Sequence, residues 1–215
     1  MNPKRFRRIK KVLEARQPDL TVLMERVNKS HNFSAILRNC DAVGVLKAHA
    51  VLPDGDLDLH HHTSAGTTRW LQVEVHQNIR HAVERLHQDG FLVLAAHPSD
   101  SAVDYRAADL ARPVAIMVGA ELDGLSPEGI ALADETVRIP MGGMVRSLNV
   151  SVATALLLFE AFRQREELGM YRSSRLPPEE LKNLLFEWAY PDIATVLRKR
   201  GNPYPILSED GEILG

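Results

Sequence analysis

The feature that most constrains the fold of this sequence is the alternation of short apolar runs with helix-forming segments after residue 20. The apolar runs are rich in branched side chains, which is typical of strands. The predicted strands are residues 21–27, 48–52, 70–75, 91–96, 114–119 and 136–139, and the predicted helices between them are residues 32–43, 78–89, 127–134 and 147–168. This alternation indicates a single α/β domain over about residues 20–168.

The two ends of the chain have a different character. Phe6, Ile9 and Leu13 recur at helical spacing among lysines and arginines, which predicts an amphipathic N-terminal helix with a cationic face. After the domain, the pattern predicts two more helices at about residues 178–189 and 192–200. We therefore expect a basic helical arm at residues 1–19, the α/β domain at residues 20–168 and a C-terminal helical extension at residues 169–215.

Composition excludes several classes of protein. No apolar run approaches the roughly twenty residues of a membrane span, and the charged N-terminus does not lead into a signal-peptide core, so we expect a cytoplasmic protein. The single cysteine, Cys40, cannot form an internal disulfide and is expected in the core. The net charge of −2 argues against a nucleic-acid partner. Basic residues nevertheless gather at both ends of the chain, where they fit either solvated helix faces or a nucleic-acid contact surface.

Two loops that follow predicted strands place polar side chains where α/β proteins bind ligands. In residues 32–39, Asn32 can cap the following helix, and Arg38 can either extend to solvent or serve a site. In residues 119–126, small residues form a tight turn that can hold Glu121 toward a cleft. From spacing alone, a simple turn and a ligand site fit this second loop equally well.

A third loop, residues 139–151, carries a stronger signal. It places Ser147 and Asn149 at the mouth of a helix that is otherwise apolar, and capping explains only one of the two. We expect this helix to pack inside the domain because it is apolar nearly all round. A nucleotide-triphosphate site is disfavoured, because Leu125 stands where a phosphate-binding loop needs lysine.

Together, these loops resemble the three ordered motifs of the TrmH family in the SPOUT superfamily. They read N-F-S-A-I-L-R at residues 32–38, V-G-A-E-L-D-G-L-S at residues 118–126 and I-P-M-G-G-M-V-R-S-L-N-V-S-V-A-T-A-L at residues 139–156. The likeness begins at M-N-P-K-R-F and extends through nearly the whole chain, both basic ends included. It implies an open, mainly parallel sheet with helices on both faces and a C-terminal trefoil knot, an exception to the near-absence of knots in proteins.

The resemblance also implies that S-adenosylmethionine (AdoMet) is the cofactor. Backbone groups would hold it, at Ala96, Gly119, Ile139, Met141 and Leu148. Ala96 departs from the threonine expected in near relatives. A contact through the main chain would tolerate that change.

The activity that the resemblance implies is 2′-O-methylation of a tRNA ribose, with guanosine 18 of the D-loop as the expected target. The likeness assigns Arg38 to catalysis, and Asn32, Glu121, Ser147 and Asn149 to organising the ribose and the methyl donor. Because a guanidinium stays protonated at neutral pH, we expect Arg38 to clamp a phosphate and to stabilise the alkoxide, not to act as a base.

Two alternatives remain open. The first is a 2′-O-methyltransferase that acts on ribosomal RNA or on another tRNA position; a ribosomal enzyme would be expected to carry a further N-terminal domain. The second is a non-catalytic RNA-binding protein on the same scaffold, against which the presence of the motif residues argues.

The resemblance implies tRNA and a second copy of the chain, in a homodimer, as partners. The candidate phosphate contacts are Arg5, Arg8, Arg16, His31, Arg163 and Arg165. The run at residues 60–62, three adjacent histidines, is not expected to bind a metal, because its members cannot all face one ion. Methyl transfer needs no metal, and no metal site is expected.

Overall fold

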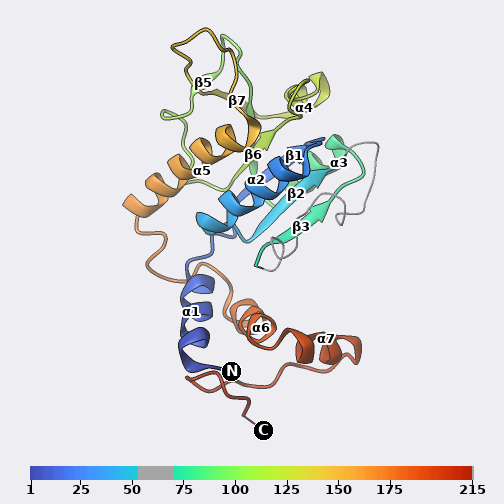
Figure 1. The fold of residues 1–215 in the computed structure, drawn as a ribbon, viewed down its shortest axis with the longest axis vertical. Coiled ribbons are helices and arrows are strands. Elements are labelled where there is room, and N and C mark those ends of the chain that lie inside the picture. The colour runs from blue at the N-terminus through green and yellow to red at the C-terminus, as the bar shows by residue number, and fades with distance from the viewer. Residues whose placement is uncertain (53–69, 215) are drawn as a thin grey trace. The chain divides into compact units, whose positions relative to one another are not determined.

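The computed structural model describes residues 1–52 and 70–214. These residues form two compact units (Figure 1): residues 18–168, called here the sheet unit, and residues 1–17 with 169–215, called here the helical unit. The first and last segments of the chain thus belong to one unit. In the described part of the chain, no helix is long and apolar enough to cross a bilayer.

A seven-stranded sheet organises the sheet unit, in the order β3-β2-β1-β6-β4-β7-β5, and every pair of neighbouring strands is parallel. The strands are β1 (Leu20–Glu25), β2 (Lys47–Val51), β3 (Gln72–Val75), β4 (Leu92–Ala96), β5 (Val103–Asp104), β6 (Val114–Val118) and β7 (Glu135–Arg138). This confirms the predicted α/β domain with an open parallel sheet. Strand order does not define how the chain is threaded, so the trefoil knot stays a prediction.

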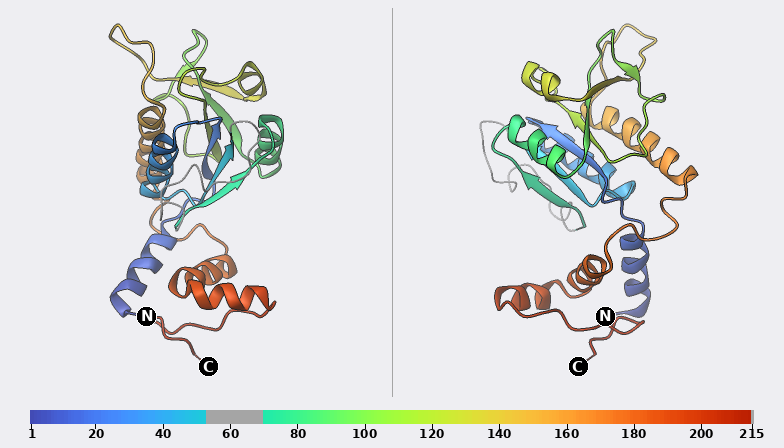
Figure 2. Two further views of the ribbon diagram at one scale, coloured as in Figure 1. Left: turned by 45° about the vertical axis from the view of Figure 1, so that its right-hand side comes forward. Right: turned by 180° about the vertical axis from the view of Figure 1, so that it is seen from behind.

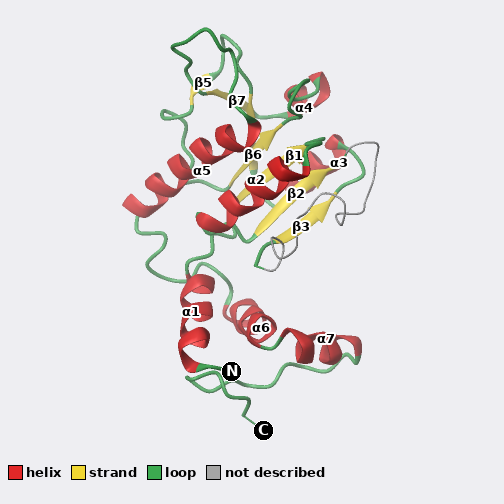
Figure 3. Cartoon of the chain, in the orientation of Figure 1, coloured by secondary structure: helices red, strands yellow, loops and turns green. Residues whose placement is uncertain are grey.

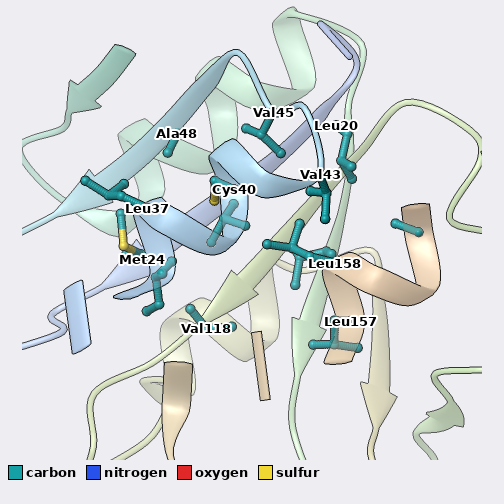
Figure 4. Close-up of a cluster of buried hydrophobic side chains, with 14 of the residues drawn as sticks. Leu20, Met24, Leu37, Cys40, Val43, Val45, Ala48, Val118, Leu157 and Leu158 are labelled. Carbon is teal, nitrogen blue, oxygen red and sulfur yellow. The ribbon is translucent and has the colours of Figure 1, made fainter. Parts of the chain in front are cut away.

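Helices cover both faces of this sheet, as predicted (Figure 2). On one face, α2 (Ser30–Ala42) and α5 (Val150–Glu167) pack on the central strands in a core that includes Cys40 and Leu158 (Figure 4). On the other face lie α3 (Ile79–Gln88) and α4 (Pro127–Leu132), over a second core. The central strands β1 and β6 are therefore buried on both sides, which accounts for the wholly apolar sequence of β6 and the mainly apolar sequence of β1.

The prediction that α5 packs inside the domain is only half right. Its inner face buries Leu157, Leu158 and Ala161 against the sheet. Its outer face leaves Val152 48% exposed and Phe159 51% exposed. An apolar helix face open to solvent is unusual for a protein that works alone.

The helical unit contains α1 (Pro3–Glu14), α6 (Pro178–Ala189) and α7 (Pro191–Lys199), drawn as red helices in Figure 3. As predicted, α1 is amphipathic: it buries Phe6, Ile9 and Leu13 and exposes its cations. It packs against α6, which buries Phe186 in the same unit.

Candidate active site

A cleft of about 580 Å³ opens at the carboxyl ends of β4, β6 and β7, beside the first turn of α5. Its volume is in the range of small-molecule and cofactor sites. All five positions predicted to bind the cofactor line this cleft: Ala96, Gly119, Ile139, Met141 and Leu148. The structure therefore brings together the ends of three strands that are far apart in the sequence.

Four of the five predicted catalytic residues line the same cleft, namely Asn32, Glu121, Ser147 and Asn149. Three of them form a chain of hydrogen bonds. Asn32 donates from Nδ2 to Glu121 Oε1 at 2.8 Å, and Asn149 donates from Nδ2 to Asn32 Oδ1 at 3.1 Å. Each residue comes from a different motif, so this chain ties the three motifs into one structure. Ser147 is exposed at the mouth of the cleft.

The sequence suggested that Asn32 could cap α2, but Asn32 is not the cap. The helix begins at Ser30, with Lys29 in the capping position, and Asn32 is 2% exposed inside the first turn. Glu121 serves the helix start instead, because its carboxylate accepts from the backbone N–H groups of Lys29 and Asn28 at 3.1 and 3.2 Å. A carboxylate at a helix N-terminus is favoured by the helix dipole. Asn149 is the N-cap of α5, where it accepts from the N–H of Ser151 at 2.8 Å.

The ionisation of Glu121 follows from these contacts. Partial burial raises the pKa of its carboxyl group, but the hydrogen bonds from Asn32, Lys29 and Asn28 outweigh burial and hold the pKa below its ordinary value. Glu121 is therefore ionised at neutral pH, with its two oxygens engaged by donors of the same chain. Such a group is suited to orienting its neighbours and is a weaker base than an ordinary carboxylate.

Glu25 supports the turn that presents Glu121 by accepting hydrogen bonds from Ser126. This role was not predicted from the sequence. Glu25 ends β1, is 3% exposed, and accepts from the backbone N–H of Ser126 at 2.9 Å and from its hydroxyl at 2.5 Å. The turn closes through paired backbone hydrogen bonds between Ala120 and Gly124. The available signal was a carboxylate at the end of a mainly apolar strand, because buried acids normally have dedicated partners.

The residues of the cleft fit AdoMet. Strand ends and loops supply main-chain donors and acceptors next to apolar walls, which suits a nucleoside with a charged tail. His97, also on the wall, has a buried Nδ1 atom without a hydrogen-bond partner among the described residues, so a ligand atom can satisfy it. Arg138 and Arg146 line the cleft as well and can face a carboxylate. Sequence reasoning did not single out these three residues.

Arg38 lies elsewhere. It is exposed on α2 and is missing from the described residues that line the cleft of its own chain. The spacing that places Asn32 in the first turn of α2 directs Arg38 outward near the end of the helix. A catalytic role for Arg38 thus needs a substrate or a second chain to approach from outside.

The predicted phosphate contacts divide into two groups. Arg5, Arg8 and His31 are exposed, as a contact with RNA requires. Arg163 is also exposed, although its guanidinium forms ion pairs with Glu160 and Glu167 at 2.7 Å.

Arg16 and Arg165 are corrections to the prediction, because both side chains are 0% exposed. Arg165 donates to Asp19 Oδ1 at 2.6 Å and to the carbonyl oxygen of Leu110 at 3.0 Å. Arg16 lies over the Trp188 ring, with its guanidinium carbon 5.2 Å from the ring centre. Neither arginine is available to a phosphate. The histidine run at residues 60–62 lies outside the described residues.

Comparisons with known proteins agree with this site. The SpoU rRNA methylase family matches residues 19–159, and its C-terminal region matches residues 163–215. The chain is 50% identical to the tRNA (guanosine(18)-2′-O)-methyltransferase of Escherichia coli strain K12, over 99% of this chain and 94% of that protein.

Solved structures give the same result. The TrmH/SpoU tRNA modifying enzyme of A. aeolicus has a TM-score of 0.79 and 42% identity, and the match covers 88% of this chain and 97% of that one. The AdoMet-bound rRNA methyltransferase of Sinorhizobium meliloti has a TM-score of 0.61 and 28% identity, over 74% of this chain and 60% of that one. The protein therefore belongs to the SpoU methylase family, the family of TrmH.

Proposed function

We propose that this protein methylates the 2′-hydroxyl of guanosine 18 in tRNA, with AdoMet as the methyl donor. The observation that carries the proposal is the likeness to the E. coli guanosine-18 enzyme, which extends over 99% of the chain and so includes both units. The likeness to the ribosomal RNA enzyme covers less of this chain and only 60% of the other. Ribosomal RNA and other tRNA positions remain the rival targets, and a silent RNA-binding protein is the rival of another class.

The cleft would hold AdoMet through main-chain groups at the five positions predicted for it, with His97 Nδ1 as a further polar contact. When bound, AdoMet supplies a methyl group on a sulfonium. The 2′-oxygen would form the O–CH₃ bond as the C–S bond breaks, the demethylated cofactor would leave as a neutral thioether, and the hydroxyl proton would pass to solvent water. We also propose that β6, β7 and the start of α5 form a trefoil knot around the cofactor site.

The chain from Glu121 through Asn32 to Asn149 would position the reacting groups without reacting itself. Because Glu121 fixes Asn32 and Asn32 fixes Asn149, the mouth of the cleft keeps one geometry. Methyl transfer depends strongly on alignment, since the attacking oxygen, methyl carbon and sulfur must lie in line. We assign Ser147, exposed at the cleft mouth, to contact with the incoming ribose.

Arg38 would act as a charge. A guanidinium stays protonated in proteins and presents a planar fork that matches a phosphate. Placed beside the ribose, it would hold the adjacent phosphate and stabilise the developing oxyanion.

We propose that a second copy of the chain supplies Arg38 to the cleft, in a homodimer. Three exposed apolar side chains support this assembly, Val152, Leu156 and Phe159 on the outer face of α5, which begins at the cleft. Light scattering should give twice the 24.0 kDa chain mass. Phe159→Glu should give monomers, whereas Val196→Glu, at an exposed apolar position on α7, should not. A monomeric wild-type protein contradicts this assembly.

The exposed cations of α1, including Arg5 and Arg8, would attract the tRNA backbone, with His31 and Arg163 as further contacts on the sheet unit. In this proposal residues 1–19 and 169–215 serve RNA binding, and residues 20–168 carry out the transfer. The transfer itself uses no metal. Because tRNA is the substrate, we place the protein in the cytoplasm.

The decisive experiment combines the protein, methyl-tritiated AdoMet and an unmodified tRNA transcript, followed by mass spectrometry of the nuclease digest. We expect one methyl group per tRNA, on guanosine 18. The matched substrate carries 2′-deoxyguanosine at that position and should accept no label. Label at another nucleotide, or only on ribosomal RNA, supports one of the rival targets. Binding without transfer supports the silent protein.

A further inference from the structure

A second group of polar side chains lies at the other end of the sheet, away from the cleft. His49 on β2 and Glu74 on β3 are register partners in neighbouring parallel strands, and His76 follows Glu74 by two positions. This spacing directs all three side chains to the same face of the sheet, the face that α3 covers. The cleft opens at β4, β6 and β7, and β1 separates those strands from β2 and β3.

The three side chains converge. His49 Nδ1 and His76 Nε2 are 2.9 Å apart, and Glu74 Oε1 is 4.0 Å from His76 Nε2. One ligating atom from each residue lies within 4.8 Å of the others. In a tetrahedral zinc site with bonds of about 2.0 Å, ligating atoms are separated by about 3.3 Å. The pair of nitrogens need only move apart by a few tenths of an ångström, and the carboxylate needs to approach by somewhat more.

We propose that His49, Glu74 and His76 form a binding site for one divalent transition-metal ion of the zinc type. Two imidazoles and a carboxylate are a ligand set used by zinc, with a fourth position left for water. Imidazole ligands also select zinc, cobalt and nickel over magnesium or calcium, which prefer oxygen.

The two imidazoles are prepared for this role. Burial, followed by the nearby His76 ring, lowers the pKa of His49 to about 4, and burial also lowers the pKa of His76. The hydrogen bond that joins His49 Nδ1 to His76 Nε2 places a proton between the two nitrogens, and a bound ion would replace that proton while each neutral ring carries its own proton on the other nitrogen. His76 Nδ1 lies 3.4 Å from His81 Nδ1, so an Nδ1–H of His76 can donate a hydrogen bond to His81, and this tautomer leaves Nε2 of His76 unprotonated as a ligand.

Lys47 would compete with the ion for the carboxylate of Glu74. Its Nζ atom lies 3.1 Å from Glu74 Oε2, which leaves Oε1 to face His76. The side chain of Glu74 is 35% exposed while that of His76 is 1% exposed, so an ion would enter past Glu74. A bound ion would join β2 to the segment that runs from β3 into α3. This role is structural, and it does not depend on the proposed methyl transfer.

The test uses tag-free, full-length protein with His60→Ser, His61→Ser and His62→Ser, so that the histidine run cannot bind zinc and add to the measured stoichiometry. Isothermal titration with ZnCl₂ should show one ion per chain, and the melting temperature should rise with zinc concentration. Titration with Co²⁺ should give the visible absorption of a tetrahedral site. Absence of stoichiometric zinc binding overturns the proposal.

Variants separate this site from adventitious binding. Glu74→Gln keeps the shape of a half-exposed side chain and should weaken zinc binding about a hundredfold, with little change in the melting temperature of the metal-free protein. Lys47→Ala should tighten zinc binding several-fold, because it removes a neighbouring positive charge.

His87→Asn is the matched control, since His87 lies on α3 but bonds to Asp134 at 2.9 Å, outside the cluster. It should bind zinc as the parent does. If Glu74→Gln binds zinc like the parent, or if His87→Asn weakens binding as much as Glu74→Gln does, the proposed ligands are wrong. AdoMet affinity should be unchanged in all three variants.

Discussion

The mouth of the cleft and the surface of α1 both carry charged and polar side chains, but the two regions use them differently. At the cleft, Glu121, Asn32 and Asn149 contact one another, and a buried Glu25 supports the turn below. On α1 the cations point to solvent above a buried apolar stripe: Lys4, Arg5, Arg7, Arg8, Lys10 and Lys11. Polar groups that hydrogen-bond to one another fix the geometry of the cleft, whereas the exposed like charges of α1 create a positive electrostatic field.

This difference predicts that the cleft and α1 contribute to the proposed activity in two separate ways. Interactions inside the cleft are short, partly buried and little affected by salt, so their loss should change turnover or stability. The field of α1 is long-ranged and screened, so its loss should change RNA affinity in a salt-dependent way. The following variants test whether charge is divided in this manner.

Arg165→Ala should have the largest effect, and it acts on stability. Arg165 is fully buried, and its removal deletes the hydrogen bonds that it donates to Asp19 and to the carbonyl oxygens of Leu110 and Arg112. Breaking a buried ion pair in this way costs about 3–5 kcal/mol of unfolding free energy. Urea denaturation measures it.

The control for this variant is Arg163→Ala, two positions earlier on the exposed side of α5. Its ion pairs with Glu160 and Glu167 are at the surface, so its loss should cost about 1 kcal/mol or less. Equal costs at the two positions contradict the division between buried and exposed cations.

Arg38→Ala should lower the single-turnover rate of methyl transfer by about 10²–10³-fold, the cost of losing one charge that stabilises an oxyanion. AdoMet affinity should change little, because the proposed contacts of Arg38 are with the RNA phosphate and the developing oxyanion, and not with the methyl donor. Arg80→Ala, an exposed arginine on α3, is the control and should retain full turnover. If Arg38→Lys keeps wild-type turnover, the fork geometry of the guanidinium is not required.

How far the sequence could predict this molecule depends on the distance between interacting residues. Elements with a clear period were predicted to within a few residues, and β5 was missed because a strand of two residues, Val103–Asp104, has no period. The cleft positions came from a resemblance of motifs, since nothing in spacing alone brings Ala96 next to Leu148.

The errors arose where a partner lies far away in the chain. Arg165 and Arg163 look alike in sequence, and only Asp19, 146 positions away, makes the first a buried ion pair. Asn32 looked like a cap because its partner Glu121 is 89 positions away. The pairing of His49 with His76 spans 27 positions and two strands. Local patterns cannot encode such contacts, which depend on the order of strands in the sheet.

The hydrogen-bond chain at the cleft predicts coupling between Asn32 and Asn149. Each alanine variant alone should lose about 1 kcal/mol or more, because it leaves a partly buried amide without its partner. In a double-mutant cycle on unfolding free energy and AdoMet affinity, the two losses should be non-additive by at least about 0.5 kcal/mol. Strict additivity means that the two motifs are not joined in solution.

The field of α1 predicts a salt-dependent effect. Arg5→Ala with Arg8→Ala should weaken tRNA binding, and the slope of log affinity against log salt should fall by roughly 1.4 to 1.8, from 0.7 to 0.9 per lost phosphate contact. The control pair is Arg80→Ala with Arg85→Ala, two α3 arginines that are held by carboxylates. An unchanged slope in the α1 variant excludes Arg5 and Arg8 from the RNA contact.

The smallest expected effect concerns the charge of Glu121. Its pKa lies below the ordinary value because donors outweigh burial, so the folded protein favours the ionised form. The resulting stability is fully present above the unfolded pKa of about 4.5 and is lost as the pH falls through the folded pKa. Glu121→Gln should therefore be less stable than wild type at pH 7, by about 1 kcal/mol, and the difference should shrink as the pH falls below about 4.5.

Urea midpoints measured from pH 7 downward test this prediction, with Glu128→Gln as the control. Glu128 is an exposed carboxylate on α4 that pairs with Arg80, outside the cleft. A gap between wild type and Glu121→Gln that stays constant with pH would show that the loss of an acceptor oxygen, and not the loss of charge, weakens the start of α2. In that case the carboxylate of Glu121 would act only as a hydrogen-bond acceptor, and its charge would not contribute to stability. The cleft would then differ from α1, which acts through charge, more than the contacts alone indicate.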